Sequence, residues 1–202
     1  MKNIVLLGLL FLYCCVTIAQ KSNKHKLVVD SLKTIFSKVK TVDGVQMLST
    51  NDIIENISLS KKHSILLKAL DYAGLIETFK SKGPITIFAP DNQAFEKISS
   101  GKLDSLLKPA NKFELSYILT YHAIAGRITT KDIAKKIKIN NGGVTFTTIS
   151  GGKLVAKIDS NRNIILIDEN GGKSIIQHFD IPQSNGMLHT INAVLMPKPK
   201  AI

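Results

Sequence analysis

The sequence has no tryptophan and only two cysteines, the adjacent residues Cys14 and Cys15. Beyond them the chain has no thiol, which excludes disulfide bonds, thiol chemistry and thiolate metal sites from the rest of the protein. Long apolar runs are also missing after the N-terminus, where no segment approaches the ~18 apolar residues that a membrane helix needs. A folded domain must therefore be held together by its apolar core.

The N-terminus has the pattern of a signal peptide. Lys2 precedes an almost unbroken apolar run over residues 4–16, and residues 17–19 supply the small side chains of a cleavage site. Two alternatives are a retained membrane anchor and lipidation of either cysteine. We expect residues 1–19 to be removed, which leaves a mature chain with no cysteine and no transmembrane segment. We expect the mature protein to be secreted, either to the cell exterior or to the periplasm. Association with the cell surface is an additional option.

Acidic residues are scarce, since 15 Asp and Glu face 27 Lys and Arg and give a net charge of +12. Such a charge favours anionic partners, an acidic polysaccharide or a phospholipid surface, and solubility alone is the alternative. Nucleic acid is not expected, because aromatic residues are not interleaved with the lysines as stacking platforms would be. The lysines are dense at four places: Lys21, Lys24 and Lys26; Lys61, Lys62 and Lys68; Lys102, Lys108 and Lys112; and Lys131, Lys135, Lys136 and Lys138.

The first half of the chain carries the signals of short helices. An apolar stripe predicts an amphipathic helix over residues 27–39, and the apolar, β-rich residues 85–89 predict a buried strand. Further helices are expected to begin at capping residues: at Asp52, at Ser60, at Asp91 or Asn92, and at Asn111 with Glu114 three residues on.

The second half changes character and reads as strands. Paired glycines and asparagines lie between the apolar segments and supply the positive-φ residues of tight turns. Helices followed by a run of strands indicate an α+β domain with a mostly antiparallel sheet. The predicted strands are 137–139, 144–149, 154–159, 164–168, 174–180 and 188–196.

Three segments in this order resemble the signatures of the fasciclin (FAS1) domain family. They are residues 85–95, in which a strand turns through Pro90 into a helix, residues 119–128, and residues 185–197. The resemblance implies a wedge-shaped β-sandwich with helices packed against it. It also divides the chain into a signal peptide (1–19), a basic N-terminal extension with a short amphipathic helix (20–47), the fasciclin-like domain (48–197) and a C-terminal tail (198–202).

The resemblance further implies adhesion as the function. Family members are secreted or attached to surfaces and bind cell-surface proteins, matrix polymers or glycans, and a few resemble carriers of small hydrophobic ligands such as carotenoids or lipids. In some animal members a Tyr-His pair flanked by branched apolar residues is linked to integrin binding. The corresponding partner-binding candidates are Tyr121, His122, Ile118, Leu119 and Ile124, and the residues expected to maintain the motif structure are Pro90, Asp91, Asn92 and His189.

His122 is open to two interpretations. It can contact a partner, or it can be a buried histidine whose ring nitrogens are hydrogen-bonded inside the domain. Its apolar neighbours favour burial, and we place its hydrogen-bond partners near the turn at Asp91 and Asn92. Tyr121 is expected to have its ring inside and its hydroxyl bonded or solvated at the rim.

No enzyme, cofactor or metal site is predicted. No nucleophile-elbow sequence is present, and the glycine pairs separate strands, so they read as turns rather than phosphate cradles. The histidines show no i, i+4 pairing and no cysteine partners, although two of them could approach each other on neighbouring strands. The five histidines are His25, His63, His122, His178 and His189, and the last two are that pair.

Overall fold

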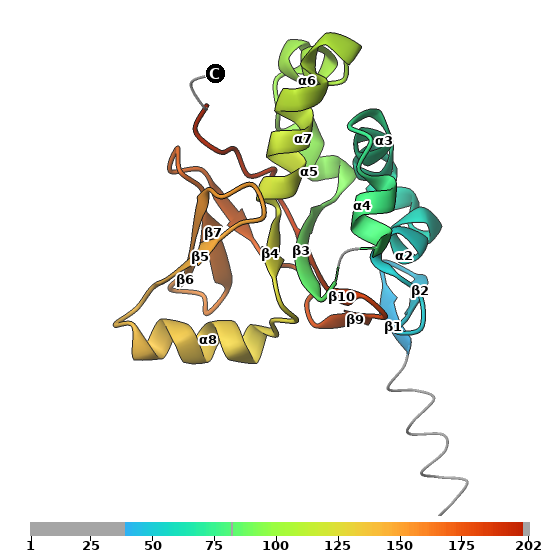
Figure 1. Cartoon of the computed structure of the whole chain (residues 1–202). Helices are drawn as coiled ribbons and strands as arrows, with labels where there is room; N and C mark the ends of the chain where they lie inside the picture. Colours follow the sequence, from blue (N-terminus) through green and yellow to red (C-terminus); the bar gives the residue numbers. More distant parts are fainter. Residues whose placement is uncertain (1–38, 82, 200–202) are drawn as a thin grey trace, which may run out of the picture. The chain divides into compact units, whose positions relative to one another are not determined.

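The computed structural model describes residues 39–81 and 83–199, and its fold belongs to the unit Lys40–Ile202 (Figure 1). The predicted signal peptide and the predicted amphipathic helix, apart from its last residue, lie outside the described residues. Residues 40–47, which we assigned to the extension, are part of this unit. They form most of a hairpin of β1 (Val39–Val42) and β2 (Val45–Leu48), and Val42 and Met47 lie in the apolar core.

Short helices make up most of the first half. Leucine, isoleucine and alanine side chains form their buried faces, and these helices surround the first of two apolar clusters. The elements are α2 (Ile53–Leu59), the 3-10 turn η1 (Lys61–His63), α3 (Ser64–Tyr72), α4 (Ile76–Ser81), α5 (Asn92–Glu96), α6 (Ser100–Leu106), η2 (Pro109–Asn111) and α7 (Lys112–Tyr121).

Two of the predicted helix caps are confirmed. Asp52 accepts a hydrogen bond from Glu55 N at 2.8 Å and completes a capping box, and Asp91 accepts one from Ala94 N at 2.7 Å. The predicted capping by Ser60 and by Asn111 is wrong. The Ser60 hydroxyl bonds the ring of a buried histidine, and the Asn111 side chain donates to the backbone of the preceding helix, so neither caps.

The strands other than β1 and β2 form two four-stranded sheets (Figure 1). One has the order β4-β3-β10-β9, in which β3 (Ile85–Pro90) pairs in parallel with β10 (Gly186–Ile191) and lies between it and β4 (Ala123–Ala125). β9 (Ile181–Gln183) pairs with the other edge of β10. The second sheet is antiparallel throughout and has the order β5 (Val144–Thr147), β6 (Lys153–Ile158), β7 (Ile164–Ile167) and β8 (Lys173–Ile175). The α+β class and the hairpins of the second sheet are thereby confirmed. The predicted strands 174–180 and 188–196 are too long, because they end at Ile175 and Ile191, and β9 was not predicted.

One helix was missed by the sequence analysis. Residues Thr130–Ile139 form α8, so the strand predicted at 137–139 is wrong. Apolar residues at 137 and 139 alternate as in a strand, but Ile137 is buried and Ile139 is 68% exposed, on different sides of a helix. Ile133 and Ile137, one helical turn apart, pack instead on Leu154 and other residues of the second apolar cluster.

Candidate functional site

The five predicted partner-binding residues are all buried. Tyr121 ends α7 and is 0% exposed, and none of the five side chains is more than 5% exposed. The Tyr121 hydroxyl donates to Lys153 O at 2.6 Å and accepts from Glu169 N at 3.2 Å. Burial raises the pKa of this phenol well above its ordinary value. The hydroxyl was expected to be either hydrogen-bonded or solvated, and it is hydrogen-bonded. Its two bonds connect the end of α7 to β6 and to the turn that follows β7.

His122 follows directly and is also bonded inside the domain. Its Nδ1 lies 2.8 Å from Ile118 O, and its Nε2 accepts from Leu195 N at 2.9 Å. A ring nitrogen that accepts is unprotonated, so Nδ1–H donates to the carbonyl and the imidazole is neutral. Burial lowers the pKa of His122 to about 4. The prediction of a buried, hydrogen-bonded histidine is confirmed.

The neighbourhood proposed for His122 was wrong. Asp91 caps α5, and the Asn92 side chain accepts from Ile65 N at 3.0 Å, at the start of α3. Asp91 and Asn92 therefore make hydrogen bonds at the starts of α5 and α3 and none with His122 among the described residues. The burial of the Tyr-His pair favours a structural role inside the domain over direct contact of the pair with a partner.

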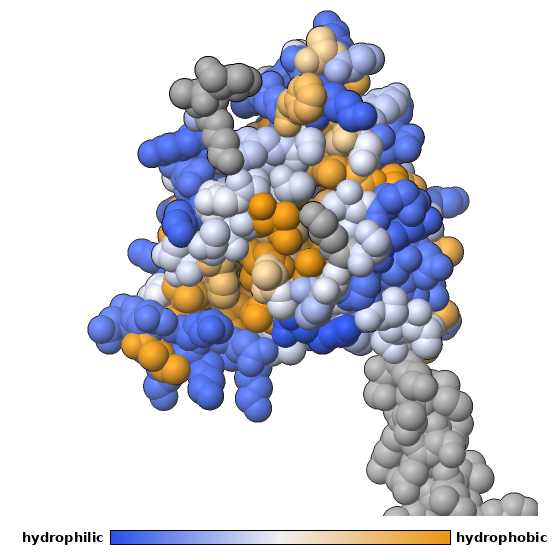
Figure 2. All heavy atoms as spheres, in the orientation of Figure 1, coloured by the Kyte–Doolittle hydropathy of each residue, from blue (hydrophilic) through white to orange (hydrophobic). Residues whose placement is uncertain are grey.

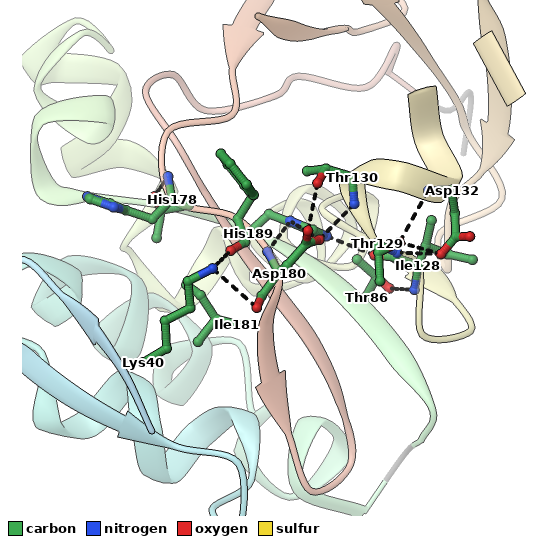
Figure 3. Close-up of polar contacts among 12 residues, drawn as sticks. Lys40, Thr86, Ile128, Thr129, Thr130, Asp132, His178, Asp180, Ile181 and His189 are labelled. Atoms are coloured by element: carbon green, nitrogen blue, oxygen red, sulfur yellow. Dashed lines mark hydrogen bonds and ion pairs between the residues drawn. The ribbon is translucent and has the colours of Figure 1, made fainter. Parts of the chain in front are cut away.

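His189 has a comparable structural role on β10 (Figure 3). Its Nδ1 accepts from Asp180 N at 3.2 Å, and its Nε2 lies 2.9 Å from Ile128 O, to which it donates. The ring is stacked on Phe88 with a centroid separation of 5.7 Å. Burial lowers the pKa of His189, so it too is held neutral. His189 joins the end of β10 to the segment that leads into α8.

The N-terminus of α8 is fixed by two carboxylates, both visible in Figure 3. Asp180 accepts from Thr130 N and from the Thr130 hydroxyl, each at 2.7 Å. Thr129 and Asp132 form a capping box, and the hydrogen bond from the Thr129 hydroxyl lowers the pKa of Asp132. Backbone N–H groups of the first turn that have no partner within the helix are therefore hydrogen-bonded, and the start of α8 is fixed in position.

Four exposed lysines lie on α8, and Figure 2 shows hydrophilic surface along this helix. Lys131, Lys135 and Lys138 are spaced i, i+4, i+7 and so share one side, with Lys136 on another. Within residues 39–81 and 83–199, none of the four lysines forms an ion pair, whereas Lys62 is paired with Asp43 at 2.9 Å. We call these four side chains the α8 basic face. They present a cluster of positive charge to solvent, and the exposed carboxylate of Asp132 on the same helix partly offsets the charges of Lys131 and Lys135.

A groove beside α7 is the second candidate. It has a volume of about 690 Å³ and lies between α7 and the C-terminal residues that follow β10. Phe113, 88% exposed, and Tyr117 line it from the helix, and Met196 and Pro197 line it from the other side. This α7 groove is large enough for a small apolar molecule.

Other kinds of site find no support among the described residues. His178 and His189 come from adjacent segments, as expected, but the ring of His178 faces Asp43, 3.3 Å away, and His189 is bonded elsewhere. No group of three or more metal-ligating side chains occurs in the described part of the chain. No helix there is long and apolar enough to cross a membrane.

The α8 lysines were predicted from the sequence, but the helix that carries them was not. The signal was present, because Thr129 and Asp132 have capping-box spacing and two isoleucines follow one turn apart. Phe113 and Asp180 were also missed. The exposure of Phe113 and the long-range contact of Asp180 with Thr130 depend on tertiary packing, which leaves no local pattern.

Comparison with known proteins shows that residues 61–197 match the family described as the Fasciclin domain. The protein sll1483 of Synechocystis sp. is 32% identical over 149 residues, which cover 74% of this chain and 75% of that protein. The transforming growth factor-beta-induced protein ig-h3 of Sus scrofa is 29% identical over 157 residues, covering 78% of this chain but 21% of its own length.

The fold also matches a solved structure. It is a FAS1 domain pair from the insect cell adhesion molecule Fasciclin I, with a TM-score of 0.63 and 17% identity. The match covers 81% of this chain and 58% of the solved one. At this identity the likeness bears on the fold alone.

Proposed function

Since this chain belongs to the fasciclin domain family, we propose that it is an exported, non-enzymatic adhesion protein that binds an acidic polysaccharide through the α8 basic face. The single observation that carries the proposal is a firmly capped helix with four exposed lysines and, among the described residues, no ion-paired partner. The export signal expected at residues 1–19 would bring the protein to surface polymers. The same lysines could instead bind a cell-surface protein that has an acidic patch.

Adhesion is also the function of one similar protein. The solved FAS1 pair comes from a cell adhesion molecule, but at 17% identity that likeness supports only the fold, and we propose adhesion here from the family to which the chain belongs. The buried Tyr121 and His122 leave the partner to be bound by other surfaces, and α8 is joined to the same framework through the second apolar cluster.

The expected binding is electrostatic and made of weak contacts. An exposed ion pair contributes about 0.2–1 kcal/mol, so useful affinity needs several lysines at once and a polymer that repeats its charges. The interaction should weaken with salt, because the screening length falls to about 8 Å at physiological ionic strength. A single lysine substitution is expected to have little effect.

Charge reversal with a matched control tests the proposal. We would replace Lys131, Lys135 and Lys136 by Glu together, and compare binding to an immobilised polyuronate at low salt. The control is the triple reversal of the lysines at 102, 108 and 112, which changes the net charge equally. We expect at least tenfold weaker binding for the α8 variant and a much smaller loss for the control. Equal losses would mean that net charge alone, and not α8, governs binding.

The α7 groove supports a second candidate, a carrier of a small hydrophobic ligand. Its apolar lining and its volume of about 690 Å³ lie in the range of small-molecule sites, about 300–1,000 Å³. Protein purified without detergent would be extracted with organic solvent and the extract analysed by mass spectrometry. A stoichiometric apolar ligand that is lost in the Phe113→Asp variant would establish the carrier. An empty extract, together with no binding of added carotenoid or lipid, would exclude it.

A further inference from the structure

A smaller groove runs along one flank of α8, which we call the α8 groove. Its volume is about 370 Å³, and it lies between the first turns of α8, the turn that joins β6 to β7, and the segment before β9. Lys131 and Ala134 line it from the helix, Ile158 and Arg162 from the β6–β7 hairpin, and Phe179 from the third side. Lys131 also belongs to the α8 basic face, so the groove and that face form a continuous surface.

Two cations face this groove without a direct ion pair, although the Asp132 carboxylate lies near Lys131. Neither Lys131 nor Arg162 forms an ion pair with any residue in the described ranges. The acidic groups nearby are engaged in the backbone: Asp159 accepts from Asn163 N at 2.8 Å, Asp180 from the start of α8, and Asp132 in its capping box. The residues that line the groove include these two cations and no carboxylate, so the groove is suited to an external anion.

The remaining walls are apolar and partly exposed. Phe179 is 47% exposed and Ile158 is 45% exposed, which is high for side chains of their size. Lys40 Nζ lies 5.2 Å from the centroid of the Phe179 ring and covers one of its faces. The rest of that ring contributes to the groove, so a ligand here meets an apolar wall beside two positive charges.

We propose that the α8 groove binds one uronic acid unit of the acidic polysaccharide. The sugar carboxylate pairs with Arg162 and Lys131, and the C–H groups on one side of the pyranose ring pack on Phe179 and Ile158. A guanidinium is planar and matches a carboxylate in a two-pronged hydrogen bond, which a lysine alone cannot supply. This proposal rests on the proposed function. A polysaccharide held by the α8 basic face would place one of its uronic acid units in the adjoining groove.

The assignment separates the two surfaces by their chemistry. The lysines of α8 would hold any polyanion, whereas the α8 groove would favour a carboxylate attached to a ring with an apolar side. A chain of phosphates has the charge but no apolar side, so it gains nothing from Phe179. Selectivity between polymers of equal charge density is thus the property that the groove adds.

The test uses the mature chain, an oligogalacturonate and a polyphosphate of equal charge. Arg162→Gln and Phe179→Ser are compared with wild type by calorimetry, and Lys173→Gln, an exposed change on β8, is the control. We expect each groove variant to bind the oligogalacturonate about five- to tenfold more weakly. Phe179→Ser should bind polyphosphate as wild type does, and the control should be close to wild type for both. If Phe179→Ser leaves oligogalacturonate binding unchanged, the groove assignment is overturned while the α8 basic face can still stand.

A monomeric ligand tests the α8 groove separately from the binding of a polymer to the α8 basic face. Saturation-transfer NMR with galacturonate should give a signal from wild type that is lost in both groove variants. If no polymer binds at low salt but this signal is present, the proposed function fails and the groove assignment survives. If galacturonate gives no signal and octanoate does, the groove takes an aliphatic carboxylate and the assignment is wrong.

Discussion

Acidification should destabilise this protein through His122. The ring is fully buried and neutral, and its pKa falls from the ordinary value of 6.5 to about 4. Between these two values the unfolded chain binds a proton that the folded chain does not, so stability falls as the pH falls. At pH 4.5 nearly the whole interval has been crossed, which corresponds to a loss of about 2 kcal/mol relative to pH 7.

A variant isolates this contribution from that of other groups. In His122→Gln the side-chain amide can still donate to Ile118 O and accept from Leu195 N, but it cannot be protonated in this range. We expect the variant to be less stable than wild type at pH 7 and to lose about 2 kcal/mol less on acidification to pH 4.5. Urea unfolding at pH 7, 5.5 and 4.5 measures both curves. Parallel curves would refute the reasoning, because the histidine would then be protonated alike in both states.

Three substitutions test the fold that supports the site. Tyr121→Phe removes the hydroxyl that bonds Lys153 O and should cost about 1–3 kcal/mol in urea unfolding; an unchanged midpoint would contradict that bond. Gly186→Ala places a Cβ 2.0 Å from Ile85 O, so a loss of about 2–4 kcal/mol is expected in thermal unfolding, and normal stability would disprove the close β3–β10 approach. Asp180→Ala should cost about 0.5–2 kcal/mol and speed amide exchange in the first turn of α8, while unaltered exchange would rule out its capping role.

Local chemistry explains what the sequence predicted correctly. Asp52 was identified as a cap, and Asp91 was one of two candidates with Asn92, because a capping bond joins residues three apart and needs nothing else. The antiparallel hairpins of the second sheet follow from turn residues between short apolar segments. The parallel pairing of β3 with β10 has no such signal, since residues 91–185 separate the two strands in the sequence.

The candidate site also combines features that local sequence patterns predict with features that depend on long-range contacts. Tyr121 and His122 were predicted as partner-binding candidates, but both are buried, and the contacts that bury Tyr121 come in part from the second sheet. At residues 137–139 an alternating pattern competed with a helical one, and the helix is supported both by the capping box at Thr129 and by the packing of Ile133 and Ile137. Arg162 and Phe179 meet only because the β6–β7 hairpin and the segment before β9 both approach α8, which no local pattern predicts.

The salt dependence of polyuronate binding tests the central claim most directly. The affinity of wild type and of the triple charge reversal at Lys131, Lys135 and Lys136 would be measured from low to high ionic strength. We predict a steep decline for wild type and a clearly shallower one for the variant, with both proteins folded alike by circular dichroism. A flat response of the wild type, or identical slopes for the two proteins, would contradict a recognition role for the α8 basic face.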